Sequence, residues 1–218
     1  MNEDVTVCIV DDDERVRSAL LRLLTSAGFR ARTYPSARAL LAEGWRSNHA
    51  PTVVLADLRM PDIDGFGLAE RLALLPLSPP IVFLSAHADV AATVRAMKGG
   101  AIDFLEKPPQ EDELLEALGR AAARSRKQIL EREALHDLQE RHARLTPRER
   151  QVFGLIVSGM INKEAAWELG ISEKTVKVHR ARVVEKMGAR SLPDLVRMAG
   201  HLRIAVNAGG PRAQAHAG

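Results

Sequence analysis

Five short apolar runs alternate with amphipathic stretches along the first 119 residues of the chain. The runs in the middle of this region are almost wholly apolar, which is typical of strands covered by helices on both faces. We predict strands at Val5–Val10, Arg30–Tyr34, Thr52–Ala56, Pro80–Leu84 and Ala101–Leu105. We predict helices at Glu14–Ala27, Ser36–Ala42, Gly65–Leu75, Val90–Lys98 and Glu111–Ala123. Strands and helices in this alternation predict a doubly wound parallel sheet.

Residues 120–145 form a second region, which has no strand pattern. They contain no Pro or Gly and are rich in Arg, Glu, Ala and Leu, so we predict a helix that continues from the fifth helix. One face carries an apolar stripe of Ile129, Leu130, Ala134, Leu135 and Leu138. Because the heptad pattern is poor, two interpretations stay open: a linker helix that pairs with a second copy, or a single solvated helix.

The region from Leu145 onward is predicted to form short helices only. Thr146 is a predicted N-cap, followed by Pro147, and Glu149 completes a capping box. The predicted helices are Pro147–Val157, Lys163–Leu169 behind an Asn162 cap, Glu173–Met187 behind Ser172, and Pro193–Leu202. The middle two flank Gly170 at the spacing of a helix-turn-helix.

These patterns define the predicted fold class and the domain boundaries. The fold class is an α/β flavodoxin-like doubly wound parallel sheet, joined by a helical linker to a small all-α helix-turn-helix domain. The predicted boundaries are 1–123 for the first domain, 124–144 for the linker, 145–206 for the second domain and 207–218 for a tail. The tail is rich in Ala and Gly and is predicted to be disordered.

Charge separates the two halves of the chain. Residues 1–119 contain 12 Lys and Arg against 18 Asp and Glu, a balance of −6, and residues 146–218 contain 12 against 6, a balance of +6. This asymmetry predicts that only the second half meets nucleic acid. The single cysteine, Cys8, excludes an internal disulfide framework and fits a reducing cytoplasm. We expect a cytoplasmic protein with no membrane partner, because no apolar stretch has membrane-spanning length and a signal peptide is missing.

Polar side chains follow several of the predicted strands. Asp11 and Asp12 follow the first strand, Asp57 the third, Ser85 the fourth and Lys107 the fifth. In an open parallel sheet these carboxyl ends are where a ligand site forms. Closely packed carboxylates need a cation, and Mg²⁺ suits them because it favours carboxylate oxygens and keeps waters for an incoming phosphoryl group. A carboxylate at such a site can be the nucleophile that forms an aspartyl-phosphate.

The first half resembles a response-regulator receiver domain. The acidic pair, Asp57, Ser85 and Lys107 with the following proline all stand at the spacings of that family. The resemblance implies that Asp57 is the phosphoacceptor, that Ser85 and Lys107 bind phosphoryl oxygens, and that Lys107 precedes Pro108 in a cis peptide. It implies no enzymatic activity beyond self-catalysed phosphoryl transfer to Asp57 and hydrolysis of the product.

The resemblance also implies how Mg²⁺ is bound. Asp12 is the direct ligand and Asp11 a nearby one that acts directly or through water. Asp57 and the backbone carbonyl of Arg59 complete the protein ligands. Asp13, in contrast, is predicted only to start the first helix.

Two residues are candidates for the switch of a receiver domain. Ser85 and Phe104 would couple the phosphoryl group to the surface of the fourth helix, fifth strand and fifth helix. Phe104 has no hydroxyl, so its signal would be steric, and a plain core role stays open. Residues 85–90 and 97–104 resemble the FixJ-type branch of the family. His87 there either influences the lifetime of the phosphate or is an exposed loop histidine.

Other origins of the acidic cluster are disfavoured. A chance cluster of loop charges would require suitable polar residues to occur by accident at the ends of four separate strands. Asp11–Asp13 also matches the Asp-x-Asp start of haloacid-dehalogenase phosphatases. Arg15, however, stands where their Thr or Val belongs, and Asp57 would have no role in that chemistry.

The second half resembles a LuxR-type helix-turn-helix domain over residues 145–152, 158–164, 169–172 and 174–179. In its third helix Val176, Val183 and Met187 share one side, which we expect to face the core. The opposite side and its flanks carry the predicted DNA-reading residues Lys174, Lys177, Val178, Ala181 and Arg182. Contacts with the phosphate backbone of DNA are predicted at Asn162, Lys163, Thr175 and His179. Trp167 is bulkier than this family usually carries in the first of the two helices.

Together the resemblances imply a DNA-binding transcriptional response regulator. A sensor histidine kinase would phosphorylate Asp57, which promotes a homodimer that binds promoter half-sites in double-stranded DNA. We expect the protein to activate transcription rather than repress it, with RNA polymerase as a possible partner. The alternative is a phosphorylation-independent DNA-binding regulator, against which the complete set of site residues argues. A ligand-sensing LuxR-type regulator would need an apolar amino-terminal pocket, which the charged strand ends argue against.

Overall fold

The computed structural model describes residues 4–43, 50–86 and 90–204. The chain divides into two compact units, Met1–Leu130 and Glu131–Gly218, and each is described by itself. The predictions for His87 and for the tail 207–218 lie outside the described residues.

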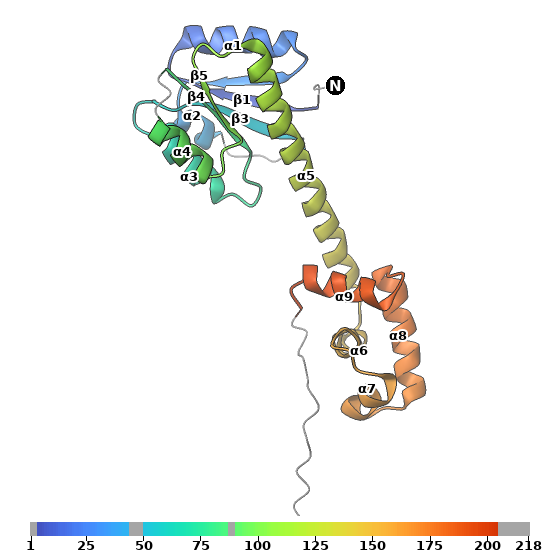
Figure 1. Cartoon of the computed structure of the whole chain (residues 1–218). Coiled ribbons are helices and arrows are strands. Elements are labelled where there is room, and N and C mark those ends of the chain that lie inside the picture. The colour runs from blue at the N-terminus through green and yellow to red at the C-terminus, as the bar shows by residue number, and fades with distance from the viewer. Residues whose placement is uncertain (1–3, 44–49, 87–89, 205–218) are drawn as a thin grey trace, which may run out of the picture. The chain divides into compact units, whose positions relative to one another are not determined.

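The first unit is built on a five-stranded parallel sheet in the order β2-β1-β3-β4-β5 (Figure 1). The strands are β1 Thr6–Val10, β2 Arg30–Tyr34, β3 Thr52–Asp57, β4 Ile81–Ser85 and β5 Asp103–Glu106. This order confirms the predicted flavodoxin-like sheet. The last strand begins two positions later than predicted, because the N–H of Ala101 still donates to the carbonyl of Ala96 in the preceding helix, at 3.1 Å.

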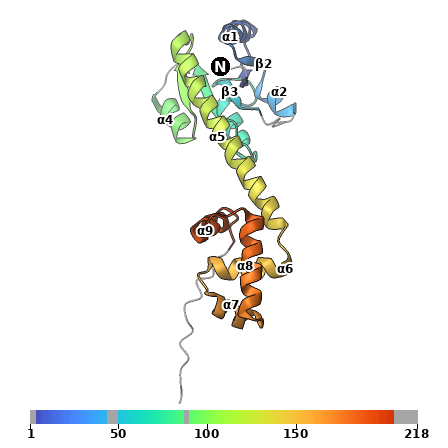
Figure 2. The same cartoon turned by 90° about the vertical axis from the view of Figure 1, so that its right-hand side faces the viewer.

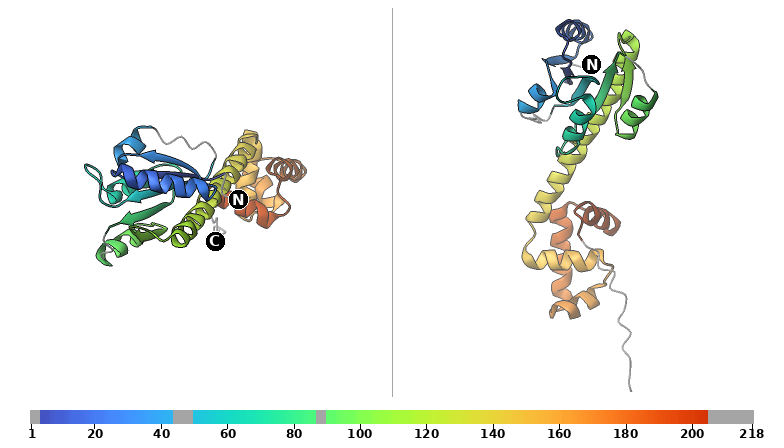
Figure 3. Two further views of the ribbon diagram at one scale, coloured as in Figure 1. Left: turned by 90° about the horizontal axis from the view of Figure 1, so that it is seen from above. Right: turned by 90° about the vertical axis from the view of Figure 1, so that its left-hand side faces the viewer.

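Helices cover both faces of the sheet, and Figure 3 shows the two layers from other directions. Helix α1 (Glu14–Ser26) and the first part of α5 (Glu111–Ala143) pack on one face, and α2 (Ala37–Ala42), α3 (Gly65–Ala73) and α4 (Val90–Lys98) on the other. Strand side chains alternate between the two apolar clusters, so that Ile9 joins the first and Val10 the second. Cys8 is buried in the second cluster, as expected of a packing residue.

Helix α5 is a single helix of 33 residues that runs through the predicted linker. Its middle is tied to the first unit, since the hydroxyl of Ser125 accepts from the N–H of Thr52 at 3.0 Å and Arg126 pairs with Asp4. The residues of the predicted apolar stripe have different surroundings. Leu138 is buried in the core of the second unit, whereas Leu130 is exposed. In the described part of the chain, no helix is long and apolar enough to cross a membrane.

The second unit contains α6 (Pro147–Val157), α7 (Asn162–Leu169), α8 (Glu173–Met187) and α9 (Leu192–His201). Figure 2 shows α8 crossing α6. The prediction of an Asn162 cap is wrong: Ile161 is the N-cap of α7, and its N–H is satisfied by the Glu164 carboxylate at 3.0 Å. Asn162 is the first helical residue, and its Oδ1 accepts from Arg180 at 3.2 Å.

Candidate functional site

Three carboxylates meet at the carboxyl edge of the sheet. Asp11 directly follows β1, Asp57 ends β3, and one oxygen from each of Asp11, Asp12 and Asp57 lies within 4.8 Å of the other two. Asp11 is 1% exposed and Asp57 8%, whereas Asp12 is exposed. Such burial is costly for carboxylates unless a cation compensates. The geometry therefore gathers the three predicted carboxylates into one cluster, two members of which are buried.

Lys107 supplies the compensating charge in this cluster. Its Nζ lies 2.6 Å from Asp11 Oδ2 and 3.1 Å from Asp57 Oδ2. Burial of Asp57 raises the pKa of its carboxyl, and the hydrogen bond from Lys107 only partly offsets this effect. Burial also opposes the charge on Lys107, but the two carboxylates outweigh it and raise the pKa of the ammonium group. One shared lysine leaves the site short of positive charge.

The acidic residues after β1 are held by the start of α1. Asp13 is the N-cap of α1, where its carboxylate accepts from the N–H of Arg15 at 2.7 Å, as predicted. Asp11 Oδ1 accepts from the N–H of Asp13 at 2.9 Å, and the Asp11 carbonyl accepts from Arg17 at 2.8 Å. These bonds fix Asp11 at the sheet edge, and its other oxygen contacts Lys107.

The loop after β3 closes tightly around Asp57. The N–H of Arg59 donates to Asp57 Oδ1 at 3.2 Å, and the N–H of Gly65 donates to the carbonyl of Leu58 at 2.9 Å. A Cβ on Gly65 would lie 2.8 Å from the backbone oxygen of Asp57 and 3.0 Å from the Phe83 ring. Only glycine fits this approach, so the start of α3 packs directly against the strand that carries Asp57.

The last two strands position Ser85 and Lys107 beside each other in the backbone. Ser85 ends β4 and is buried, and its carbonyl accepts from the N–H of Lys107 at 2.8 Å. The peptide between Lys107 and Pro108 is cis, as the resemblance implied. Phe104 is partly buried against the apolar cluster that contains Phe83. The switch roles of Ser85 and Phe104 stay predictions.

The acidic cluster fits a metal ion by its chemistry. Asp11, Asp12 and Asp57 offer oxygen atoms only, which hard divalent cations prefer. Asp12 remains exposed, so the cluster is open to solvent on one side. The shortage of positive charge around the buried pair is a further reason for a cation to bind here.

Helix α8 presents two different sides. Val176, Val183 and Met187 are fully buried, as predicted. The predicted DNA-reading residues are exposed, namely Lys174, Lys177, Val178, Ala181 and Arg182. A helix with a basic exposed side and a packed inner side has the form required for insertion into a major groove.

The residues predicted to contact the DNA backbone differ in their exposure and in their hydrogen bonds within the protein. Lys163 is exposed, whereas Asn162 is held by Arg180 as described above. The hydroxyl of Thr175 lies 2.8 Å from that of Ser172 at the start of α8. His179 has a buried Nδ1 for which the described residues provide no hydrogen-bond partner.

Glu149 has a role that its position in the sequence did not reveal. It forms the predicted capping box with Thr146, but it is also 2% exposed and lies 2.6 Å from Lys186. The hydrogen bonds from Lys186 and from the Thr146 N–H lower the pKa of Glu149 from 4.5 to about 2. The pair joins the start of α6 to the end of α8 across 37 positions, so no local pattern could predict it.

Both halves of the chain match known protein families. Residues 7–119 match the response regulator receiver domain, and residues 143–199 match the luxR family of bacterial regulatory proteins. The chain is 43% identical over 196 residues to the transcriptional regulatory protein FixJ of Rhizobium meliloti (strain 1021), covering 90% of the chain and 95% of that protein. It is 40% identical to nodulation protein W of Bradyrhizobium diazoefficiens, covering 92% and 88%.

Solved structures agree with these similarities. The response regulator StyR has a TM-score of 0.76 and 42% identity, covering 90% of the chain and 98% of StyR. Full-length FixJ from B. japonicum has a TM-score of 0.52 and 39% identity, covering 92% and 98%. Since the two families occur in the same order and over nearly the same length as in these relatives, the chain belongs to the FixJ-type two-component response regulators, in which a receiver domain precedes a LuxR-type DNA-binding domain.

Proposed function

We propose that Asp57 accepts a phosphoryl group from a partner sensor histidine kinase, and that this modification controls DNA binding by the second unit. The observation that carries the proposal is the buried contact of Asp57 with Lys107, 3.1 Å apart, beside Asp11 at the sheet edge. Burial raises the pKa of Asp57 above its usual range, which indicates a carboxylate held at a cost in stability. Perturbed groups of this kind concentrate at functional sites.

The transfer step uses the residues of the chain as follows. A carboxylate oxygen of Asp57 attacks the phosphorus of a phosphohistidine, the phosphorus–nitrogen bond breaks, and the imidazole takes the electron pair. Lys107 offers its ammonium group to a phosphoryl oxygen, and Ser85 offers its hydroxyl to another. The chain acts on its own Asp57 and is proposed to have no other enzymatic activity.

Mg²⁺ is the proposed cofactor of this site. Asp11, Asp12, Asp57 and the backbone carbonyl of Arg59 would hold it. When bound, the ion supplies positive charge to the phosphoryl oxygens. The oxygen-only donor set supports this choice.

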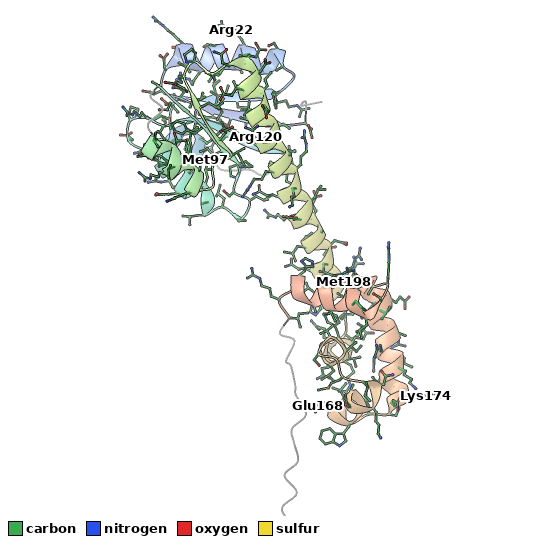
Figure 4. All side chains as sticks on the ribbon, viewed as in Figure 1. Arg22, Met97, Arg120, Glu168, Lys174 and Met198 are labelled. Carbon is green, nitrogen blue, oxygen red and sulfur yellow. The ribbon has the colours of Figure 1, made fainter. Side chains whose placement is uncertain are left out.

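Phosphorylation is proposed to favour a homodimer that binds two half-sites in double-stranded promoter DNA. Support comes from α4, whose Val90, Val94 and Met97 side chains are exposed, and from Arg120 of α5, which pairs with Asp103 of β5; Met97 and Arg120 are labelled in Figure 4. A dimer makes the second DNA contact effectively intramolecular. Nearly complete switching requires phosphorylation to favour the active state by about 5.5 kcal/mol. We propose a cytoplasmic location, and RNA polymerase as a partner in activation.

The test is the intact mass of the protein after incubation with acetyl phosphate and Mg²⁺. We expect one phosphoryl adduct on the wild type and none on Asp57→Asn. The matched control is Asp62→Asn, which alters an exposed carboxylate in the loop that follows β3 and should keep the adduct.

A stable adduct on Asp57→Asn would contradict the assignment of the phosphoacceptor. If the wild type gives no adduct, beryllofluoride distinguishes the remaining cases. A beryllofluoride-induced dimer then indicates a short-lived phosphate, and its absence favours regulation that is independent of phosphorylation.

A further inference from the structure

Arg180 lies on the inner side of α8, unlike Lys174 and Lys177, which are exposed. It follows Val176 by four positions and precedes Val183 by three, and both valines are fully buried. The arginine side chain is half-buried as a result. Arg180 is therefore directed towards the neighbouring helices of the unit and not towards a groove of DNA.

The partner of Arg180 is the first residue of α7. Its Nη1 donates to Oδ1 of Asn162 at 3.2 Å, across 18 positions of the chain. The two helices pack against each other through Ala165, Ala166 and Val176, and Figures 1 and 2 show them side by side. The hydrogen bond thus joins the inner side of α8 to the start of α7.

The chemistry of arginine fixes the orientation of the Asn162 amide. A guanidinium group has five N–H donors and no acceptor, so it can hold only the oxygen of an amide. The NH₂ group of Asn162 is then left to donate to another acceptor. The phosphate oxygens of DNA are acceptors, and Asn162 is one of the residues predicted to contact them. In the opposite orientation the amide oxygen would face the phosphate and repel it.

The charge of Arg180 favours an anion at the same place. In the described part of the chain Arg180 forms no ion pair with a carboxylate, and its partner is the neutral amide of Asn162. A half-buried cation with a neutral partner makes the local potential positive. The exposed Lys163 adds a positive charge next to Asn162, and the nearby Glu164 carboxylate is engaged by the N–H of Ile161 at 3.0 Å. The start of α7 is therefore suited to a phosphate.

We propose that Arg180 is a positioning residue for DNA binding, which holds the Asn162 amide with its NH₂ group towards a backbone phosphate and does not itself contact the DNA. The proposal rests on the proposed function, because it requires DNA binding by the second unit. The ligand is a phosphodiester of the duplex backbone. The contact therefore adds affinity for every sequence and reads no base.

The test is a double-mutant cycle in the full-length protein, with Asn162→Ala, Arg180→Gln and the double variant. The wild type activated by beryllofluoride first selects a duplex from random sequence. Anisotropy titrations at several salt concentrations then give the affinity and its salt slope for each variant, and urea unfolding reports whether each variant is folded. The matched control is Arg197→Gln, which removes an exposed arginine of α9 and should change the affinity by less than about twofold.

We expect Asn162→Ala to weaken DNA binding about fivefold, because one hydrogen bond to a phosphate is lost. Arg180→Gln should weaken it by a similar factor, since glutamine offers both a donor and an acceptor and no longer fixes the amide. Once Asn162 is alanine, Arg180→Gln should change the affinity by less than about twofold. The salt slope should stay unchanged in Arg180→Gln, because Arg180 neutralises no phosphate.

Asn162→Asp separates positioning from folding, because it keeps a partner for Arg180. The carboxylate accepts from the arginine and should preserve or increase the stability of the unit. It has no N–H donor, however, and repels a phosphate. We expect DNA binding that is weaker by about tenfold or more, with normal urea unfolding. Binding as tight as that of the wild type would overturn the proposal, because the Arg180 bond would then serve the fold alone.

The other outcomes overturn the proposal in distinct ways. A salt slope lower by about 1 in Arg180→Gln would make Arg180 a direct phosphate contact. Losses that multiply in the double variant would show that the two residues act independently. Unchanged affinity in both single variants would leave the hydrogen bond a structural one. A wild type that selects no duplex overturns the proposed function itself, and this proposal with it.

Discussion

Two buried carboxylates, Asp57 in the first unit and Glu149 in the second, each contact a lysine, yet their pKa values shift in opposite directions. At Asp57 burial dominates and raises the pKa, since Lys107 is shared with Asp11. At Glu149 the hydrogen bond from Lys186 dominates, and the Thr146 N–H adds to it. The difference separates a site that holds more negative than positive charge from an ion pair that joins two helices of the second unit.

The largest effect should come from adding the missing positive charge. If Mg²⁺ binds as proposed, about one hundred times its Kd should stabilise the first unit by about 2.7 kcal/mol, because a ligand that binds the folded cluster and not the unfolded chain favours the folded state. Urea unfolding with and without Mg²⁺ measures this gain. Asp12→Asn should lose most of it, and an equal gain in that variant would contradict the ligand assignment. The second unit should not respond.

Glu149→Gln breaks the ion pair with Lys186. It should lower the free energy of unfolding of the second unit by about 2 kcal/mol, because Lys186 and the start of α6 lose a charged partner. The pH dependence has a defined sign. Since the pKa falls from 4.5 to about 2 in the fold, the stabilisation is complete above pH 4.5 and is lost as the pH falls towards 2.

Hydrogen exchange in peptides from α6 and α8 measures this loss locally. The exposed residue Glu185, changed to Gln, serves as the control and should leave exchange unchanged. If the protection of the wild type did not decline between pH 4.5 and 2, the assigned role of the pair would be wrong.

The same type of substitution at Asp57 should change the free energy of unfolding in the opposite direction. Asp57→Asn removes a buried charge whose pKa is raised, so we expect it to stabilise the first unit by about 1 kcal/mol in the absence of Mg²⁺. Thermal unfolding near neutral pH checks this. Destabilisation comparable to that of Glu149→Gln would show that the comparison of the two carboxylates is mistaken.

The smallest effect on stability is expected at the exposed side of α8. Lys174→Ala should change the free energy of unfolding by less than about 0.5 kcal/mol, because the side chain is exposed. It should weaken DNA binding across sequences and reduce the salt slope of the affinity by about 1. Anisotropy titrations at several salt concentrations measure the slope, and an unchanged slope would remove Lys174 from the interface.

Local patterns predicted most of the elements, because each strand and helix is specified by its own apolar period and its caps. Arg30–Tyr34, Val90–Lys98 and Pro147–Val157 were predicted with the bounds that the structure has. The gathering of Asp11, Asp12 and Asp57 was also predictable, since parallel strands end at one edge. The prediction of a cap at Asn162 failed because Glu164 of the same helix accepts from the N–H of Ile161, and Arg180 of α8 donates to the Asn162 side chain.

Features that depend on distant partners could not be predicted. Nothing near Lys107 indicates that it is shared between two carboxylates, and nothing near Glu149 points to Lys186. The exposure of Trp167 was hidden for the same reason, because a bulky apolar residue in a short helix is expected to be buried until its neighbours are placed.

Helix α5 has a consequence for how such regulators are assembled from parts. Its residues Ser125 and Arg126 hold the first unit, and Leu138 belongs to the second, so the boundary between modules lies inside a helix and not in a loop. A fragment that ends at residue 123 would leave the N–H of Thr52 and the carboxylate of Asp4 without these partners. Recombination that exchanges output modules and keeps both sets of contacts must therefore join the two chains inside this helix, after Arg126 and before Leu138.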